Sequence, residues 1–144
     1  MIGQRAKIGG LILAGGSSTR LGLDKALVRI EGRTLLERVL EVVGNLCDEL
    51  FVVTSGGKTY GGLLTSHSFK TIVDREQGRG PLEGLRAGLS YSSSARNIVV
   101  ACDMPFLNHD LISYLVSISD GYDVVIPEVD GELQTLHSVY SRSC

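Results

Sequence analysis

The feature that most constrains the fold is the run Ile-Val-Val-Ala-Cys at residues 98–102, in which no side chain is charged or strongly polar. Successive side chains of a β-strand point to opposite faces of its sheet, so this strand would bury both faces. Strands of that kind occur in the middle of parallel sheets that helices cover on both sides. The run therefore predicts an α/β protein with a central, mostly parallel sheet.

Short apolar runs alternate along the chain with runs of helical periodicity. The clearest helix is predicted over 34–43, where apolar residues such as Leu36 and Leu40 recur at spacings of three and four. Thr34 and Glu37 stand at the two positions of a capping box, which marks the start of this helix.

Two further helices are predicted, one beginning at Pro81 and one after Asn108, because proline favours the first helical position and asparagine the N-cap. The helix from Pro81 would present Leu82, Leu85 and Leu89 on one face. Six segments are predicted as strands: 7–13, 49–54, 70–73, 97–102, 123–126 and 135–141.

This alternation predicts a three-layer α/β sandwich with a Rossmann-like sheet. Ligands of such sheets bind beyond the carboxyl ends of the strands. A site is therefore expected in the loops that follow strands: 14–25, 54–62, 74–80 and 103–108.

Composition limits the other options. A length of 144 residues suits one domain, and 43% hydrophobic with 21% charged residues is typical of a soluble globular protein. The net charge of −2 without a basic stripe argues against a nucleic-acid partner, and no apolar run approaches the ~18 residues of a membrane span. The three cysteines show no paired spacing, so we expect neither a zinc site nor disulfides, and a reducing, cytoplasmic setting.

The loop after the first strand reads Leu-Ala-Gly-Gly-Ser-Ser-Thr-Arg-Leu-Gly-Leu-Asp-Lys from residue 13. Gly15 and Gly16 would let the backbone turn sharply and direct N–H groups at an anion, and Arg20 and Lys25 add positive charge, a set that suits a polyphosphate. The pattern fits neither the Walker loop nor the Rossmann fingerprint. An ordinary glycine-rich turn with two solvated cations remains an alternative explanation.

Two aspartates also follow predicted strands. Asp103 would lie at the carboxyl end of the buried central strand, where a carboxylate suits Mg²⁺, although a turn residue ahead of Pro105 explains it too. Asp74 precedes a loop that leads to Gly80 and Pro81 at a helix start, and helix N-termini favour anions. The alternative for this second loop is a solvated segment without a ligand.

The motifs LAGGSSTRLGLDKAL, GPLEGL and DMPFL stand in this order, and together they resemble the molybdenum cofactor guanylyltransferase family, which has the nucleotide-diphospho-sugar transferase fold. The resemblance implies transfer of GMP from GTP to the terminal phosphate of molybdopterin with release of pyrophosphate, and molybdoenzymes or cofactor-insertion proteins as partners. It leaves open a cytidylyltransferase, a transferase for another phosphorylated acceptor, and a non-catalytic GTP-binding module.

The resemblance also implies roles for individual residues. It places Asp103 as the magnesium ligand, and Arg20 and Lys25 with Asp103 as catalytic residues. Thr54, or its neighbour Ser55, stands where the family usually has an asparagine. The implied nucleotide contacts are Leu13, Ala14, Gly15, Gly16, Lys25, Thr54, Asp74, Gly80, Pro81 and Asp103.

The family usually continues well past the point where this chain ends. We therefore expect residues 1–144 to form a single nucleotidyltransferase domain that lacks the C-terminal part of the family, on the side of the acceptor.

Overall fold

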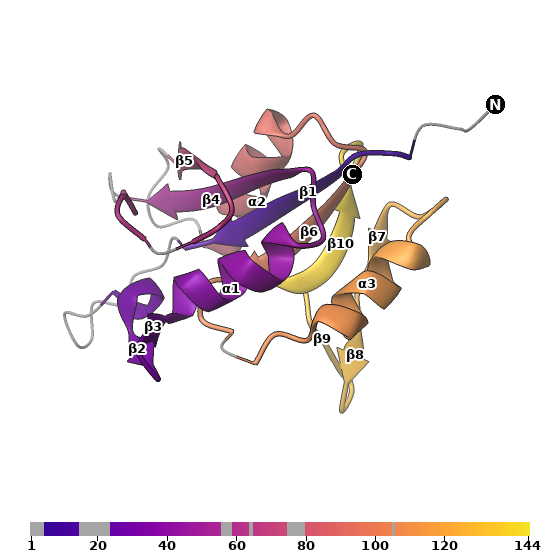
Figure 1. The fold of residues 1–144 in the computed structure, drawn as a ribbon. Coiled ribbons are helices and arrows are strands. Elements are labelled where there is room, and N and C mark those ends of the chain that lie inside the picture. Colours follow the sequence, from indigo (N-terminus) through magenta and orange to yellow (C-terminus); the bar gives the residue numbers. More distant parts are fainter. Residues whose placement is uncertain (1–4, 15–23, 56–58, 64, 75–79, 105) are drawn as a thin grey trace.

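The computed structural model describes residues 5–14, 24–55, 59–63, 65–74, 80–104 and 106–144. A six-stranded sheet in the order β5-β4-β1-β6-β10-β7 runs through their centre (Figure 1). Its strands are β1 (Ile8–Leu13), β4 (Glu49–Ser55), β5 (Lys70–Asp74), β6 (Arg96–Ala101), β7 (Val124–Val125) and β10 (His137–Ser141).

The pairing of these strands confirms the predicted mostly parallel α/β sheet. Strands β5, β4, β1 and β6 pair in parallel, whereas β10 is antiparallel to both β6 and β7. The strand predicted to be apolar on both faces is β6, which lies between β1 and β10. Its central position explains why residues 98–100 are fully buried.

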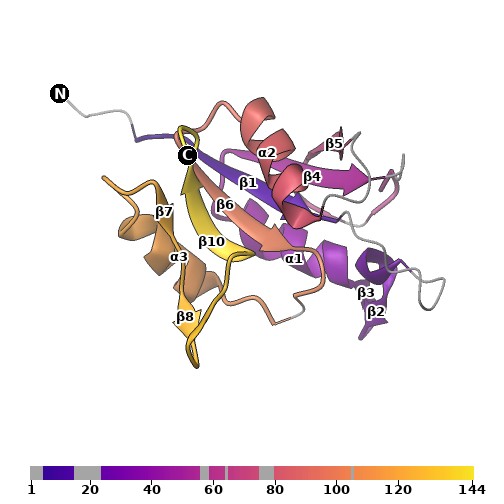
Figure 2. The ribbon, with the colours of Figure 1, turned by 180° about the vertical axis from the view of Figure 1, so that it is seen from behind.

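Three helices cover the sheet: α1 (Leu35–Gly44), α2 (Pro81–Tyr91) and α3 (His109–Ser117). Helices α1 and α3 lie in front of the sheet in Figure 1 and α2 lies behind it; Figure 2 shows the opposite view. The predicted caps are present. Thr34 and Glu37 exchange hydrogen bonds of 3.1 and 2.9 Å, and the Asn108 side chain accepts from the backbone N–H of Leu111 at 3.0 Å.

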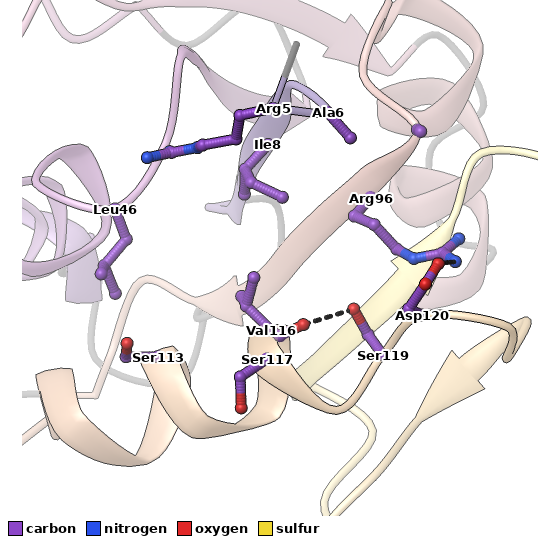
Figure 3. A pocket seen from close by; sticks show the side chains of 11 residues that line it. Arg5, Ala6, Ile8, Leu46, Arg96, Ser113, Val116, Ser117, Ser119 and Asp120 are labelled. Carbon is purple, nitrogen blue, oxygen red and sulfur yellow. Dashed lines mark hydrogen bonds and ion pairs between the residues drawn. The ribbon is translucent and has the colours of Figure 1, made fainter. Parts of the chain in front are cut away.

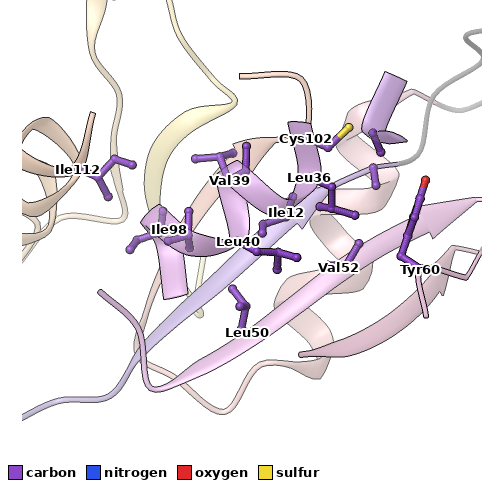
Figure 4. Packing of buried hydrophobic residues seen from close by; sticks show 14 of the residues in the cluster. Ile12, Leu36, Val39, Leu40, Leu50, Val52, Tyr60, Ile98, Cys102 and Ile112 are labelled. Carbon is purple, nitrogen blue, oxygen red and sulfur yellow. The ribbon is translucent and has the colours of Figure 1, made fainter. Parts of the chain in front are cut away.

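The hydrophobic core is divided by the sheet into two clusters. Side chains such as Ile12, Leu40 and Val52 form the cluster under α1 and α3 (Figure 4), whereas Leu11 and Val53 belong to the cluster under α2. Neighbouring residues of β1 thus point to opposite faces, as strand geometry requires. The predicted three-layer sandwich is confirmed.

Two of the three leucines predicted to form one face of α2, Leu85 and Leu89, pack against the core cluster under this helix, whereas the third does not. Leu82 is 73% exposed, and the buried residues of the helix are Gly84 and Gly88. A Cβ atom at Gly88 would lie 2.9 Å from a methyl carbon of Leu11, closer than carbon atoms approach. Gly88 thus lets the helix backbone come close to β1, whereas a Cβ atom at Gly84 would make ordinary contacts of 3.7 Å, and contact with the sheet does not depend on Leu82.

Two short hairpins and one short 3₁₀ helix among the described residues were not predicted from the sequence. The hairpins are β2 (Arg29–Ile30) with β3 (Arg33–Thr34), and β8 (Glu128–Val129) with β9 (Glu132–Leu133). Their strands have two residues each, which is too short for a periodic pattern. Glu31 and Gly32, and likewise Asp130 and Gly131, have positive φ angles in the turns, as tight hairpin turns require. The 3₁₀ helix is η1 (Lys25–Leu27).

Among the described helices, none is long and apolar enough to span a bilayer. The longest of their helices, α2, has 11 residues, about half of the ~20 apolar residues that span a bilayer.

A polar network joins the start of β4 to the loop between α2 and β6. One carboxylate oxygen of Glu49 accepts hydrogen bonds from the Ser92 hydroxyl at 2.9 Å, the Ser94 hydroxyl at 2.5 Å and the Ser93 backbone N–H at 2.8 Å. Partial burial alone would raise the pKa of Glu49, but these hydrogen bonds outweigh it and lower the pKa. The charged form is therefore favoured by folding.

This network predicts acid-sensitive stability. Because the pKa of Glu49 is lower in the folded state, its contribution is present above the ordinary value of 4.5 and is lost as the pH falls through the folded value. We expect Glu49→Gln to be less stable than wild type by about 1 kcal/mol at neutral pH, with the difference shrinking as the pH falls below 4.5. Urea unfolding at several pH values measures this. The control Glu128→Gln, at an exposed position, should follow wild type; a pH-independent deficit in Glu49→Gln would contradict the assignment.

Candidate active site

The four parallel strands end at one edge of the sheet. Leu13 pairs with Val53 and with Ala101, so β1 and β6 end together, and β4 and β5 end together two residues farther on, where Ser55 pairs with Asp74. The predicted site loops therefore leave the sheet side by side.

Backbone pairing continues one residue past the end of β1. The N–H of Ala14 donates to the carbonyl of Val53 at 2.8 Å, and the N–H of Cys102 donates to the carbonyl of Leu13 at 3.1 Å. Leu13 and Ala14 are buried, on opposite faces of the sheet. The loop that carries the glycines thus starts from a firmly held position. Gly15, Gly16 and Arg20 themselves lie outside the described residues.

Lys25 is the first residue of η1 and its side chain is exposed. Asp24 precedes it as the N-cap, and one oxygen of the Asp24 carboxylate accepts from the backbone N–H of Ala26 at 3.1 Å. The other oxygen accepts from the hydroxyl of Tyr60 at 2.8 Å. Tyr60 is only 4% exposed and belongs to the loop after β4. This hydrogen bond links the loops that follow two neighbouring strands.

Charged residues from the loops after β1 and β6 affect the pKa of Cys102. Burial, then the carboxylates of Asp103 and Asp24, raise the pKa of the Cys102 thiol to about 12, while Lys25 acts in the opposite direction. Lys25 and Asp103, which the sequence proposed as partners in phosphate and metal binding, thus lie close enough to act on one group. Asp103 is exposed in the turn after β6, so its carboxylate is accessible.

The remaining predicted residues lie farther along the same edge. Asp74 ends β5, three strands away from β6, which corresponds to roughly 14 Å at the usual strand spacing. Gly80 is the N-cap of α2 with a φ of +76°, a conformation that suits glycine, and Pro81 is the first helical residue. The structure therefore separates Asp74 from Asp103 and does not bring them into one cluster.

Thr54 is fully buried, and its hydroxyl has no hydrogen-bond partner among the described residues. It shares the α1 face of the sheet with Val52, because alternate residues of a strand point the same way. Ser55, the other residue considered for this position, points to the α2 face and is half-buried. Of the two side chains, Ser55 is the one that solvent reaches.

A cavity of about 550 Å³ lies at the opposite edge of the sheet, beside the amino ends of β1 and β6 (Figure 3). The two arginines that line it are paired with carboxylates, Arg5 with Asp48 at 3.8 Å and Arg96 with Asp120 at 3.3 Å. The cavity is not at the edge where the sequence and the strand ends place the candidate site.

Sequence reasoning missed Asp24 and Tyr60. Asp24 carried a signal, because aspartate is a preferred N-cap, but a three-residue helix leaves no periodic pattern to reveal the cap. Tyr60 carried none. Its role depends on a contact between residues 36 positions apart, which only the fold creates.

The thiol of Cys102 is expected to be unreactive in the folded protein. With a pKa of about 12, only about one part in ten thousand is ionised at pH 8. Burial and neighbouring carboxylates likewise raise the pKa of Cys47 to about 12. Alkylation with iodoacetamide at pH 8 should therefore label the exposed Cys144 first, and the other two only after unfolding. Cys144→Ser should remove the early label; rapid labelling of Cys102 in the folded protein would contradict its protonated state.

The chain is similar to characterised families over most of its length. A family model described as the MobA-like NTP transferase domain matches residues 10–144. A relative from Pelotomaculum thermopropionicum, named "Probable molybdenum cofactor guanylyltransferase", is 40% identical over 135 residues, covering 94% of this chain and 64% of the relative. The molybdenum cofactor guanylyltransferase of Desulfosudis oleivorans is 36% identical over 137 residues, covering 94% of this chain and 66% of the relative.

The fold has a matching crystal structure. The molybdopterin-guanine dinucleotide biosynthesis protein A from Archaeoglobus fulgidus superimposes with a TM-score of 0.73 and 28% sequence identity, covering 94% of this chain and 68% of that one. The chain spans slightly less than two thirds of the length of the two curated relatives. The resemblance that three motifs predicted is confirmed, and the chain belongs to the family of the MobA-like NTP transferase domain.

Proposed function

We propose that this chain binds GTP and transfers GMP to the terminal phosphate of molybdopterin, or of its metal-loaded form, with release of pyrophosphate. The observation that carries the proposal is the placement of Lys25 after β1 and of Asp103 after β6, two strands that pair in parallel and so open their loops at one carboxyl edge. Family membership and relatives named as molybdenum cofactor guanylyltransferases support the choice of reaction. We further propose that residues 1–144 form one nucleotidyltransferase domain.

The nucleotide is proposed to lie along the carboxyl edge. Its phosphates would lie near β1 and β6, where Lys25 neutralises their charge, with Gly15, Gly16 and Arg20 assigned there from the sequence. The nucleoside would extend towards β4 and β5, where Asp74, Gly80 and Pro81 lie. The separation of about 14 Å between Asp74 and Asp103 is of the order of a nucleotide's length and supports this arrangement.

Magnesium is proposed as the metal, with Asp103 as its protein ligand. No group of three or more histidine, cysteine, aspartate or glutamate residues gathers in the described part of the chain, so a site built wholly from protein ligands is not present there. An exposed carboxylate fits magnesium, which is commonly held by one or two carboxylates together with substrate phosphates and water. When bound, the metal would neutralise phosphate charge and orient the α-phosphate.

The chain itself needs no nucleophile for this reaction. An ionised acceptor phosphate can attack the α-phosphorus directly, so what the protein supplies is alignment and charge neutralisation. The thiol of the neighbouring Cys102 does not compete as a nucleophile, because its raised pKa keeps it protonated. The role assigned to Lys25 is to stabilise the charge that develops on the departing pyrophosphate.

The metal assignment predicts a large loss of activity in Asp103→Ala. Turnover should fall by about a hundredfold or more, the scale of losing a preorganised electrostatic element. Pyrophosphate release with GTP, magnesium and molybdopterin measures it. Asp123→Ala is the matched control, since Asp123 is exposed and its carbonyl bonds the Ser141 N–H at the opposite edge. Equal activity of the Asp103 variant and wild type would end the assignment.

The choice of nucleotide can be tested separately from transfer. With magnesium present, GTP should raise the melting temperature more than CTP or UTP, because only ligands that bind the folded state stabilise it. A preference for CTP would move the chain to the cytidylyltransferase branch. Binding of GTP without pyrophosphate release in the presence of molybdopterin would instead indicate a nucleotide-binding module.

A further inference from the structure

Two residues near Lys25 have no role in the reaction described above. We propose that Tyr60 and Asp24 are positioning residues, which hold the backbone of Lys25 in place so that its side chain meets the triphosphate. This inference rests on the proposed function, because it assigns Lys25 to nucleotide phosphates. It adds a residue from the loop after β4 to the phosphate end of the site, which is otherwise assigned to the loops after β1 and β6.

The first anchor lies just before Lys25. Each carboxylate oxygen of Asp24 has its own donor, the Tyr60 hydroxyl at 2.8 Å for one and the Ala26 N–H at 3.1 Å for the other. A carboxylate held from two directions has a fixed orientation. Hydrogen bonds to an ionised acceptor are also stronger than neutral ones, so this anchor is a firm one.

The second anchor lies just after Lys25. Ala26 is fully buried in the core cluster under α1. The N–H of Leu27 donates to the carbonyl of Asp24 at 3.0 Å, and the N–H of Val28 donates to the carbonyl of Lys25 at 3.2 Å. Lys25 is therefore an exposed residue between two fixed neighbours.

Tyr60 is itself well placed to act as the support. Its ring lies at the border of the core cluster, beyond Val52 of β4 in Figure 4, and its side chain is nearly fully buried. Burial, followed by the hydrogen bond and the charge of Asp24, raises the pKa of the Tyr60 hydroxyl, so this group remains a donor throughout the working pH range. Loss of the hydroxyl in Tyr60→Phe would leave the buried ring in place.

The benefit for binding has two parts. A lysine side chain is long and flexible, so fixing the backbone of Lys25 reduces the conformational freedom that is lost when the side chain binds phosphate. In addition, an unrestrained Asp24 carboxylate would repel the triphosphate, whereas the donors from Tyr60 and Ala26 direct both oxygens towards the protein.

The positioning itself can be tested without nucleotide. Tyr60→Phe should speed hydrogen exchange of the Ala26, Leu27 and Val28 amides by about tenfold, because their turn loses one anchor. Tyr140→Phe is the matched control: Tyr140 is also buried, and its hydroxyl also makes one hydrogen bond, to the carbonyl of Thr135 at 2.9 Å. Unchanged exchange at residues 26–28 in Tyr60→Phe would overturn the proposal.

The link to Lys25 is tested by nucleotide affinity in a double-mutant cycle. Calorimetry with GTP and magnesium should show binding weakened by about fivefold to tenfold in Tyr60→Phe, and unchanged in Tyr140→Phe. In a Lys25→Ala background the Tyr60→Phe change should cost less than about twofold, since the residue being positioned is gone. A loss that persists undiminished without Lys25, or no loss in the single variant, would overturn the proposal.

The two experiments separate this inference from the function on which it rests. If wild type prefers another nucleoside triphosphate, the cycle is run with that one, because Lys25 is assigned to phosphates and not to the base. If wild type binds no nucleoside triphosphate, the proposed function is wrong, and hydrogen exchange still decides whether Tyr60 holds residues 24–28.

Discussion

The structure depends above all on the parallel pairing of β1 with β4 on one side and β6 on the other. Because these strands run in the same direction, the loops that follow all three leave the sheet at one edge. Lys25 reaches that edge from β1, Tyr60 from β4 and Asp103 from β6. Antiparallel pairing of any two of these strands would send one of the loops to the opposite edge. The candidate site is therefore a consequence of strand direction.

The packing of α2 against the sheet depends on a glycine, which has no side chain to hold the helix away. Gly88 lets α2 approach the sheet closely, and the start of the same helix, at Gly80 and Pro81, stands at the carboxyl edge. The close packing thus fixes the position of a helix N-terminus beside the proposed nucleoside end of the site. Opposite it, the capping box of α1 fixes the helix that packs against η1 and hence against the turn of Lys25.

The reaction proposed for this edge depends on aligning the substrates and neutralising their charge, and it needs no reactive protein side chain. The cysteine at its centre is held protonated by burial and by the carboxylates of Asp103 and Asp24. In the proposed reaction, Lys25 and Asp103 act through charge, on phosphates and on a metal. Such a site gains from rigid supports, because the position of a charge decides how much it stabilises a transition state. The buried hydrogen bond between Tyr60 and Asp24 is a support of this kind.

The sequence by itself determined the α/β class, the six strands of the central sheet, the three helices that cover it and the edge at which the site is proposed. It did so because burial on both faces, helical periodicity and capping are local patterns that survive in a single chain. Tertiary structure alone decided that Asp74 stands apart from Asp103, that Leu82 is exposed, and that Tyr60 reaches Asp24. Strand order, helix approach and a contact across 36 positions are set by packing between distant segments, and no local pattern encodes them.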